Sequence, residues 1–565
     1  EGNPSFVFYE GPPSANGMPG IHHVMARTIK DIFCRYKTMK GFHVKRKAGW
    51  DTHGLPVELG VEKALGITKE DIGKKISVDD YNAACRQEVM KYTKEWETLT
   101  NSMGYWVDMN DPYITYDNRY IESVWWLLSQ LYNKGYLYKG YTIQPYSPAA
   151  GTGLSTHELN QPGCYRDVKD TTVTALFAMV NPRPEMAEWG KPYFVAWTTT
   201  PWTLPSNTAL CVGPKIEYVC VQTYNPYNGE KISIVMAKDL VKSYLKAEGA
   251  ELPMEEYKQG DKVVPYRIVA NYMGSDLVGM QYKQLMPWVK PLEKVDANAA
   301  PFVKEYAETN PDKCFAVGND KFVELEEKAF RVIPGDYVTT EDGTGIVHIA
   351  PTFGADDAKV AKAAEIPSLF MINKKGETRP MVDLTGKYYT LDECAQEFID
   401  TCVSVDAYSN HAGDYVKNAY DPQYNPGGKF DEKAAQKAED LNVVICMEMK
   451  QEGVAFKIEK HVHNYPHCWR TDKPVLYYPL DSWFIKTTAA RERMMELNET
   501  IKWKPQSTGT GRFGKWLENL QDWNLSRSRY WGTPLPIWRT EDGTEELCID
   551  SVETLYNEIE KSIAA

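Results

Sequence analysis

The feature that most constrains this chain is the order of segments in its first 54 residues. Phe6–Tyr9 is a short apolar run that stops at Gly11-Pro12-Pro13, which predicts a buried strand entering a loop. Apolar residues then recur between residues 23 and 40 on one face of a helix. Phe42–Val44 predicts a second strand. Strand, loop, helix and strand in this order are the opening of a parallel α/β unit.

The sequence changes from an α/β pattern to a β-rich pattern near residue 165, and the α/β pattern returns near residue 460. Residues 171–180, 193–199, 217–222 and 231–236 have the composition of strands, with Pro, Gly and Asn turns between them. The simplest architecture is an α/β domain split by a long β-rich insertion. We therefore expect domains at 1–165, 166–460 and 461–565, the last running into a later connective region.

Composition narrows the function. The net charge of −13 argues against a protein whose whole surface binds nucleic acid. No apolar run approaches the ~20 residues of a membrane span, and no leader is evident, so we expect no membrane partner. The 11 cysteines include no Cys-x-x-Cys pair, which favours reduced thiols and a cytoplasmic location.

A loop rich in Gly and Pro lies between the first predicted strand and the first helix. This loop includes Pro13, Asn16, Gly17 and Gly20, and it ends at His22-His23. Doubly wound sheets bind nucleotides at this point, where a helix N-terminus offers N–H groups to phosphates. Imidazoles there can stabilise charge that builds up at a phosphate. The alternative is an ordinary βα loop with two capping histidines.

A second motif, Gly49-Trp50-Asp51-Thr52-His53-Gly54, follows the second predicted strand. An aspartate at the end of a strand can hold an α-ammonium group. The alternative is an aspartate that caps a helix.

Together these segments resemble the class I aminoacyl-tRNA synthetases, in the form of their isoleucine-specific members. The resemblance implies a Rossmann-type parallel nucleotide-binding fold that uses ATP with Mg²⁺. His23 matches the last histidine of the family's His-x-Gly-His signature, whereas Gly20 replaces the first and His22 replaces the glycine. The implied catalytic residues for adenylation are His22 and His23. The implied ATP-binding residues are Pro13, Asn16, Gly17, Gly20 and His23.

Two strings inside the predicted insertion carry several polar groups. Thr198–Asn207 is Thr-Thr-Thr-Pro-Trp-Thr-Leu-Pro-Ser-Asn, whose hydroxyls could orient a water molecule. Asp342–Pro351 contains His348 and is followed by a loop with two aspartates. The alternatives are a sheet edge with paired threonines and a strand followed by a helix cap.

Both strings resemble the editing domain of the isoleucine-specific enzymes. The resemblance implies that Thr199, Thr200 and Asp357 are catalytic, that Asp357 holds an ammonium group, and that His348 excludes the larger amino acid. The implied editing pocket consists of Thr198, Thr199, Thr200, Thr203, Asn207, His348 and Asp357. The implied amino-acid pocket consists of Pro13, Asp51, His53, Trp483 and Trp531.

The spacing of His461, His463, His467 and Cys468 suggests a zinc site. The paired cysteines that some family members carry here are absent, so zinc is doubtful and we expect no metal ligands. The histidines are then hydrogen-bonded strand or linker residues.

The resemblance implies an isoleucine–tRNA ligase with tRNA(Ile), isoleucine and ATP as partners, acting as a monomer. The family's Lys-Met-Ser-Lys-Ser signature is absent, so we expect an N-terminal portion that does not aminoacylate efficiently by itself. The alternatives are a valyl- or leucyl-specific enzyme, or a chain that only hydrolyses misacylated tRNA. A nonenzymatic tRNA-binding module would need a stronger basic stripe than Lys45-Arg46-Lys47.

Overall fold

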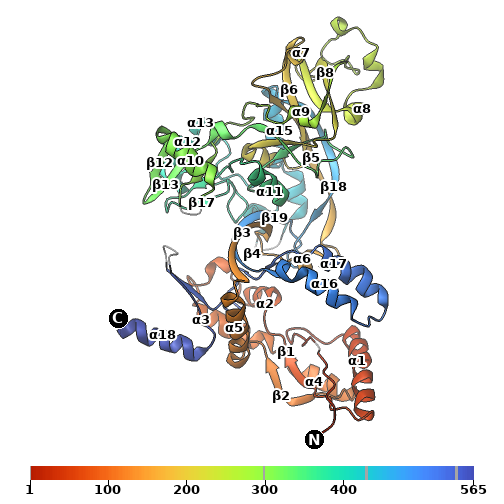
Figure 1. The fold of residues 1–565 in the computed structure, drawn as a ribbon, viewed down its shortest axis with the longest axis vertical. Coiled ribbons are helices and arrows are strands. Elements are labelled where there is room, and N and C mark those ends of the chain that lie inside the picture. Colours follow the sequence, from red (N-terminus) through yellow and green to blue (C-terminus); the bar gives the residue numbers. More distant parts are fainter. Residues whose placement is uncertain (1, 10, 297–298, 427–429, 541–544, 565) are drawn as a thin grey trace. The chain divides into compact units, whose positions relative to one another are not determined.

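The computed structural model describes residues 2–9, 11–296, 299–426, 430–540 and 545–564. The chain forms two compact units (Figure 1), of which the first combines residues 1–140 with 481–565 and the second is 141–480. Because the second unit is continuous and the first is in two pieces, the second is inserted into the first. The chain passes between the units within β3 (Leu137–Ser147) and β19 (Leu476–Ile485). The functional domain limits after residues 165 and 460 remain predictions.

Parallel pairing organises the beginning of the first unit. β1 (Lys47–Trp50) runs parallel to β2 (Asp108–Ile114). The N-terminal segment joins through two parallel bridges, Ser5 with His43 and Ser14 with Asp51. Mixed α/β structure with parallel strands, as the sequence predicts, is therefore present. The strands expected at 6–9 and 42–44 are reduced to extended chain with these bridges, and regular strand structure begins only at Lys47.

The first unit also contains helices from both of its pieces. They are α1 (Ile21–Met39), α2 (Leu55–Leu65), α3 (Val78–Val89), α4 (Thr93–Ser102), α5 (Asn118–Asn133), α16 (Arg491–Glu499), α17 (Gly514–Glu518) and α18 (Val552–Ala564). Its short strands are β20 (Trp523–Asn524), β21 (Ile537–Arg539) and β22 (Glu546–Cys548). The chain turns between α3 and α4 at residues 90–92. The break is stabilised where the Tyr92 N–H turns away to donate to the Ala15 carbonyl at 3.0 Å.

Helix α1 packs on its unit through a polar side. Its buried residues are Asp31 and Cys34, and Asp31 pairs with Arg35 and Arg46. The apolar face that the sequence indicates is exposed in this unit, at Met25, Ile29, Ile32, Phe33 and Tyr36. The side of α1 that packs on the unit instead carries an ion-pair network.

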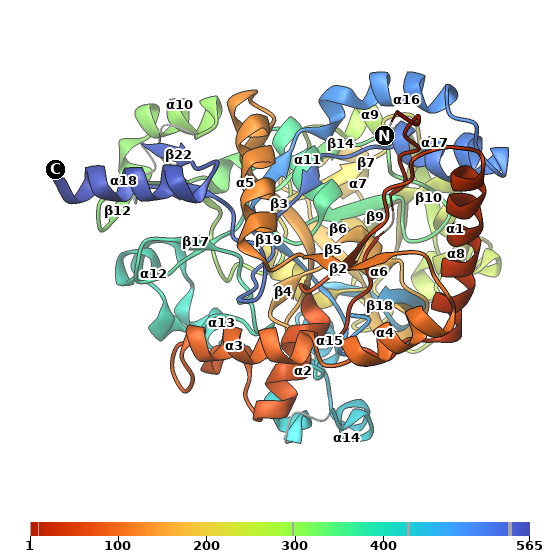
Figure 2. The same cartoon turned by 90° about the horizontal axis from the view of Figure 1, so that it is seen from below.

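A six-stranded sheet forms the centre of the second unit, in the order β10-β8-β9-β6-β5-β18. The strands are β5 (Tyr165–Ala178), β6 (Lys191–Thr198), β8 (Glu217–Tyr224), β9 (Lys231–Ala237), β10 (Arg267–Met273) and β18 (Ala455–Pro466). Figure 2 shows β5 and β6 side by side, in agreement with their antiparallel pairing. Most residues of β5, β6, β8 and β9 are buried, since both faces of the sheet are covered.

Smaller elements complete the second unit. The strands are β4 (Thr152–Gly153), β7 (Ala209–Val212), β11 (Leu292–Lys294), β12 (Cys314–Val317), β13 (Asp320–Glu324), β14 (Arg331–Pro334), β15 (Ile346–Ile349), β16 (Met371–Ile372) and β17 (Thr378–Arg379). The helices are α6 (Thr156–Leu159), α7 (Pro184–Ala187), α8 (Val241–Tyr244), α9 (Gly274–Leu277), α10 (Pro301–Thr309), α11 (Ala355–Ala363), α12 (Gln396–Cys402), α13 (Val405–Tyr408), α14 (Glu432–Lys437) and α15 (Leu441–Gln451). Among the residues described, no helix is both long and apolar enough to cross a membrane.

Candidate functional site

The predicted phosphate loop ends at the N-terminus of α1. Gly20 is the residue before the helix, and its N–H donates to His23 Nδ1 at 3.0 Å. The neutral His23 ring therefore carries its proton on Nε2. Burial and the neighbouring His22 and Arg27 lower the pKa of His23, which favours this neutral form. The first turn of α1 has no acidic residue, so its N–H groups and an imidazole donor fit an anion.

Gly20 leaves room for the His22 ring beside the start of α1. The His22 ring lies over it, and a Cβ atom added to Gly20 would stand 2.8 Å from His22 Cε1. The two histidine rings are in contact, with centroids 3.8 Å apart. The structure thus brings His22, His23 and Gly20 together.

Helix α4 also contacts the predicted phosphate loop, through Trp96. Trp96 Nε1 donates to the Gly17 carbonyl at 2.9 Å, and the Trp96 ring meets His23 edge-on at 4.7 Å. Asn16 Oδ1 accepts a hydrogen bond from Ser14 Oγ at 2.8 Å. The sequence offered no motif for Trp96, which is 2% exposed.

The residues predicted to bind the amino acid lie in the first unit. The Asp51 N–H donates to the Pro13 carbonyl at 2.9 Å, which joins the two motifs. The rings of His53 and Trp531 are 5.5 Å apart, and Trp531 Nε1 donates to the Thr52 carbonyl at 2.6 Å. Burial lowers the pKa of His53 to about 4. These contacts gather Pro13, Asp51, His53 and Trp531. Trp483 lies on β19, where its N–H donates to Ser526 Oγ.

Glu58 is a buried carboxylate that sequence analysis did not single out. It lies on α2, is 3% exposed, and its Oε1 accepts from the N–H groups of Tyr530 and Trp531 at 2.8 and 2.9 Å. Two charge-assisted bonds of this kind fix the loop that carries Trp531 against α2. The only sequence signal was its place in the motif after Gly54.

The two polar strings of the second unit meet at a cavity of about 340 Å³. Its walls include Thr198, Thr199, Thr200 and Thr203 from one string and His348 and Asp357 from the other. Thr198 ends β6, His348 lies in β15, and Asp357 lies in the first turn of α11. The other residues that line the cavity and were not predicted are Trp197, Tyr337, Val338, Thr339, Asp342, Gly343, Thr344, Gly345, Ile346, Val347, Ala350 and Phe353.

The threonines form a connected set of hydroxyls. Thr200 Oγ1 lies 3.3 Å from both Thr198 Oγ1 and Thr203 Oγ1, and the Thr200 N–H donates to Thr198 Oγ1 at 3.1 Å. Thr203 Oγ1 donates to the Thr200 carbonyl at 2.8 Å. Such a set can position a water molecule or an ester oxygen.

His348 is the buried wall of the cavity. Thr203 Oγ1 lies 2.9 Å from His348 Nε2, and Asn207 Nδ2 lies 3.0 Å from His348 Nδ1. Burial lowers the pKa of His348 to about 4. Asn207 is 1% exposed and lies behind this wall, so that it acts on the cavity through the imidazole.

Asp357 is the acid of the cavity, and its side chain is half-buried. Its Oδ2 accepts from the Ala350 N–H at 2.9 Å, and burial raises its pKa to about 6. A carboxylate in this state binds a cation readily because a positive partner restores the ionised form. The geometry therefore suits an ammonium group.

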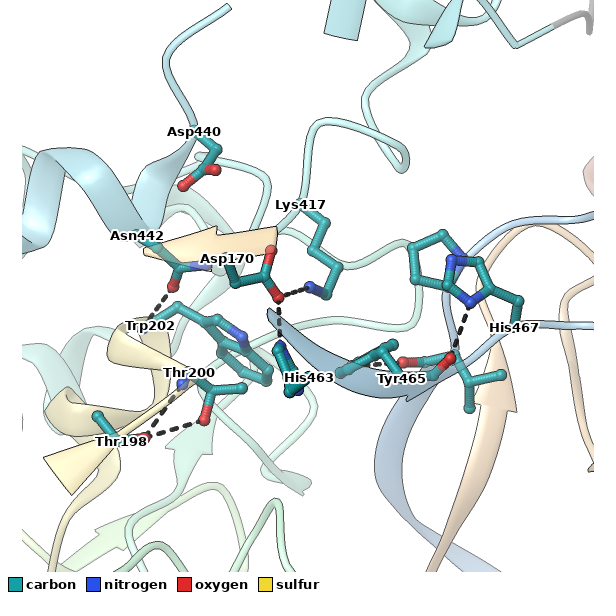
Figure 3. Close-up of polar contacts among 12 residues, drawn as sticks. Asp170, Thr198, Thr200, Trp202, Lys417, Asp440, Asn442, His463, Tyr465 and His467 are labelled. Atoms are coloured by element: carbon teal, nitrogen blue, oxygen red, sulfur yellow. Dashed lines mark hydrogen bonds and ion pairs between the residues drawn. The ribbon is translucent and has the colours of Figure 1, made fainter. Parts of the chain in front are cut away.

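Figure 3 shows the polar contacts of His463, in β18, and of His467, just after it, together with Thr198 and Thr200 of the cavity. His463 Nε2 lies 3.0 Å from Asp170 Oδ2, to which Lys417 Nζ donates at 3.5 Å. His467 Nδ1 donates to the Tyr465 carbonyl at 3.0 Å. The part of the chain that the structure describes contains no group of three or more His, Cys, Asp or Glu placed to hold a metal.

Comparison with known proteins places these sites in context. The family model described as tRNA synthetases class I (I, L, M and V) matches residues 1–564. An isoleucine–tRNA ligase of Bacteroides thetaiotaomicron is 74% identical over 565 residues, which are 100% of this chain and 47% of that protein. Those of Porphyromonas gingivalis and Cytophaga hutchinsonii are 64% and 57% identical, and this chain covers 46% of each. The chain therefore spans about half the length of the curated relatives it matches.

Proposed function

Because this chain belongs to the class I tRNA synthetases, we propose that it supplies the adenylation loop and the editing pocket of an isoleucine–tRNA ligase. In the whole protein, ATP activates isoleucine, which is then transferred to tRNA(Ile). Valine attached in error is removed by hydrolysis in the second unit. Action as a cytoplasmic monomer is part of the same proposal.

The observation that carries the proposal is the cavity of about 340 Å³ in the second unit. A pocket that selects by apolar contact gains only about 1–3 kcal/mol from one methylene group, so it separates valine from isoleucine poorly; isoleucine-specific synthetases are the standard example of this limit. A second pocket that admits only the smaller residue multiplies the selection. The cavity combines a set of hydroxyls, a half-buried carboxylate and a wall at His348, as such a pocket needs.

Each polar group has a role in that hydrolysis. Asp357 binds the ammonium group of the attached valine. The hydroxyls of Thr199 and Thr200 hold the ester and the attacking water. The His348 ring limits the size of the side chain that enters.

The first unit fits the activation step. Class I synthetases use ATP with Mg²⁺, and Mg²⁺ supplies charge neutralisation at the phosphates. The N–H groups that begin α1 and the Nε2–H of His23 suit the phosphates as donors, with His22 beside them. Asp51 would hold the ammonium group of isoleucine, and Trp531 would contact its side chain.

An exchange assay tests the activation half of the proposal. In a protein of the relatives' full length that contains this chain, isoleucine is expected to support ATP–pyrophosphate exchange far better than valine or leucine. His22→Ala is expected to slow the exchange, and unchanged exchange would remove His22 from the mechanism. Preferential exchange with valine or leucine would favour the corresponding specificity instead.

Hydrolysis by this chain alone is the second candidate function. The cavity lies wholly within one compact unit, 141–480, so it does not depend on the activation site for its walls. Deacylation of Val-tRNA(Ile) without measurable exchange would favour this narrower activity.

A further inference from the structure

The hydrogen bonds behind the editing cavity determine where the proton of His348 lies. Asn207 Nδ2 faces the Ala209 carbonyl at 2.8 Å and the Ile349 carbonyl at 3.5 Å. A carbonyl oxygen only accepts hydrogen bonds. The group that faces them must therefore be the amide NH₂, and this fixes the orientation of the Asn207 side chain.

Tyr282 fixes the same amide from the other side. Its hydroxyl donates to Asn207 Oδ1 at 2.6 Å. The Tyr282 ring is 2% exposed and packs edge-on against Phe177 and Phe330, with ring centroids 5.4 and 6.0 Å away. The Tyr282 N–H also donates to the Phe330 carbonyl at 2.9 Å. The hydroxyl is thus held by a rigid part of the core.

The oriented amide in turn determines the tautomer of His348. Because Asn207 Nδ2 is a donor, His348 Nδ1 must accept, and the proton of the neutral ring lies on Nε2. The Nε2–H then donates to Thr203 Oγ1, whose own proton goes to the Thr200 carbonyl. Every donor in this chain meets an acceptor, and both ring nitrogens are engaged.

From this chain we infer that Tyr282 and Asn207 are positioning residues that hold His348 as a neutral, Nε2-protonated ring. The ring is then a wall and a hydrogen-bond donor, and its one lone pair, on Nδ1, already accepts from the Asn207 NH₂ group and is not free to take a proton from water. Hydrolysis in the cavity therefore proceeds without a histidine base. This catalytic meaning rests on the proposed editing function, whereas the tautomer is a property of the chain itself.

The surroundings of His348 support the neutral state. The titratable groups that line the same cavity are Asp342, Asp357 and Tyr337, and Tyr282 lies behind the ring through Asn207. Burial alone is the cause of the low pKa of His348. A second proton on Nδ1 would point at the Asn207 NH₂ group, which cannot accept it.

Nitrogen NMR of this chain with ¹⁵N-labelled histidine tests the inference without any substrate. A spectrum of His348→Gln assigns the signals of the ring. We expect a protonated Nε2 and an unprotonated Nδ1 at every pH well above 4. A proton on Nδ1, or titration near the ordinary histidine value of about 6.5, would overturn the inference.

Three variants distinguish the effects of the two positioning residues on His348 from the effects of a general loss of structure. Asn207→Asp presents a carboxylate to the ring, so the proton is expected on Nδ1 and the pKa of His348 to rise by about 1–3 units. Tyr282→Phe leaves Asn207 Oδ1 without its donor, and only the two backbone carbonyls still orient the amide. A minor Nδ1-protonated population is therefore expected beside the main tautomer, and deacylation of Val-tRNA(Ile) is expected to slow by up to about tenfold. Tyr408→Phe is the control, because it removes an equally buried hydroxyl that donates to the Tyr389 carbonyl.

The outcomes distinguish this inference from the proposed function. A Tyr282→Phe spectrum identical to that of the unsubstituted chain would remove Tyr282 from the mechanism. An unchanged ring pKa in Asn207→Asp would do the same for Asn207. The expected spectrum in a chain that does not deacylate Val-tRNA(Ile) would support the tautomer and contradict the editing function.

Discussion

Replacing Asp357 by Asn removes a negative charge from the editing cavity and keeps the size of the side chain. The asparagine can still accept from the Ala350 N–H, which Asp357 now does at 2.9 Å. The local fold is therefore retained, and the change acts on the charge that we assign to the ammonium group of a bound valine.

The size of the effect follows from the charge and the burial. A hydrogen bond to a charged partner contributes about 1.5–3 kcal/mol, so affinity should fall roughly 10- to 100-fold. The pKa of Asp357 is about 6 in the empty cavity. The ligand needs the ionised carboxylate, so affinity is full above this value and is lost as the pH falls through it, by about tenfold per unit.

Calorimetric titration with valine joined by an amide bond to an aminoadenosine measures this affinity without hydrolysis. Asp357→Asn should bind weakly at neutral pH and should lose the pH dependence below 6. Asp356→Asn is the matched control, since Asp356 is exposed in the same first turn of α11. Equal affinities for Asp357→Asn and the unsubstituted chain would refute the assignment of the ammonium site.

Three further predictions concern stability. Gly345→Ala should destabilise the second unit by about 2–5 kcal/mol in urea, because φ is +75° and the new Cβ would lie 2.4 Å from Ala237 Cβ; Gly318→Ala, with positive φ but open space, should cost only about 1–2 kcal/mol. Glu58→Ala should cost about 3 kcal/mol and weaken isoleucine binding, because two N–H groups lose their acceptor. The depressed pKa of His53 means that the unfolded chain takes up a proton first, so about 3 kcal/mol of stability should be lost as the pH falls from about 6.5 to about 4.

Each of these has a result that contradicts it. An equal loss of unfolding free energy for Gly345→Ala and Gly318→Ala would show that the close contact with Ala237 is relieved without a measurable cost. Glu58→Ala should differ from Glu97→Ala, which removes an exposed carboxylate from α4, and a similar small change in both would deny Glu58 its structural role. A stability curve that keeps its slope in His53→Gln would place the acid sensitivity elsewhere.

Features that depend on neighbours in sequence could be predicted. The alternation and turns around residues 217–222 and 231–236 predicted strands, and β8 and β9 are found there. The Gly- and Pro-rich segment before residue 21 predicted a loop that leads into a helix, and α1 begins at Ile21. In each case the signal lies within about ten residues.

Features decided by distant partners could not be predicted. The sequence shows the apolar stripe of α1, but it does not show that Asp31 pairs with Arg46 on the buried side while the stripe is exposed. The break between α3 and α4 contains no Gly or Pro that would signal it in the sequence. It is stabilised instead by a hydrogen bond from the Tyr92 N–H to the Ala15 carbonyl. Neither contact can be predicted from local helix or strand propensity.

The same division applies to the sites. Thr198–Thr203 and His348 lie in recognisable motifs, and the structure brings them to one cavity, although their roles stay predictions. Tyr282 reaches the cavity through Asn207, 75 residues away, and Glu58 caps the N–H of Tyr530, 472 residues away. Such supporting residues follow only from the folded chain.

The central claim is that the cavity of the second unit separates valine from isoleucine by size after transfer to tRNA. The most direct test compares the rates at which this chain releases the amino acid from Val-tRNA(Ile) and from Ile-tRNA(Ile) in a single turnover. We predict rapid release of valine with isoleucine spared. Equal release of both amino acids, or faster release of isoleucine, would contradict the claim.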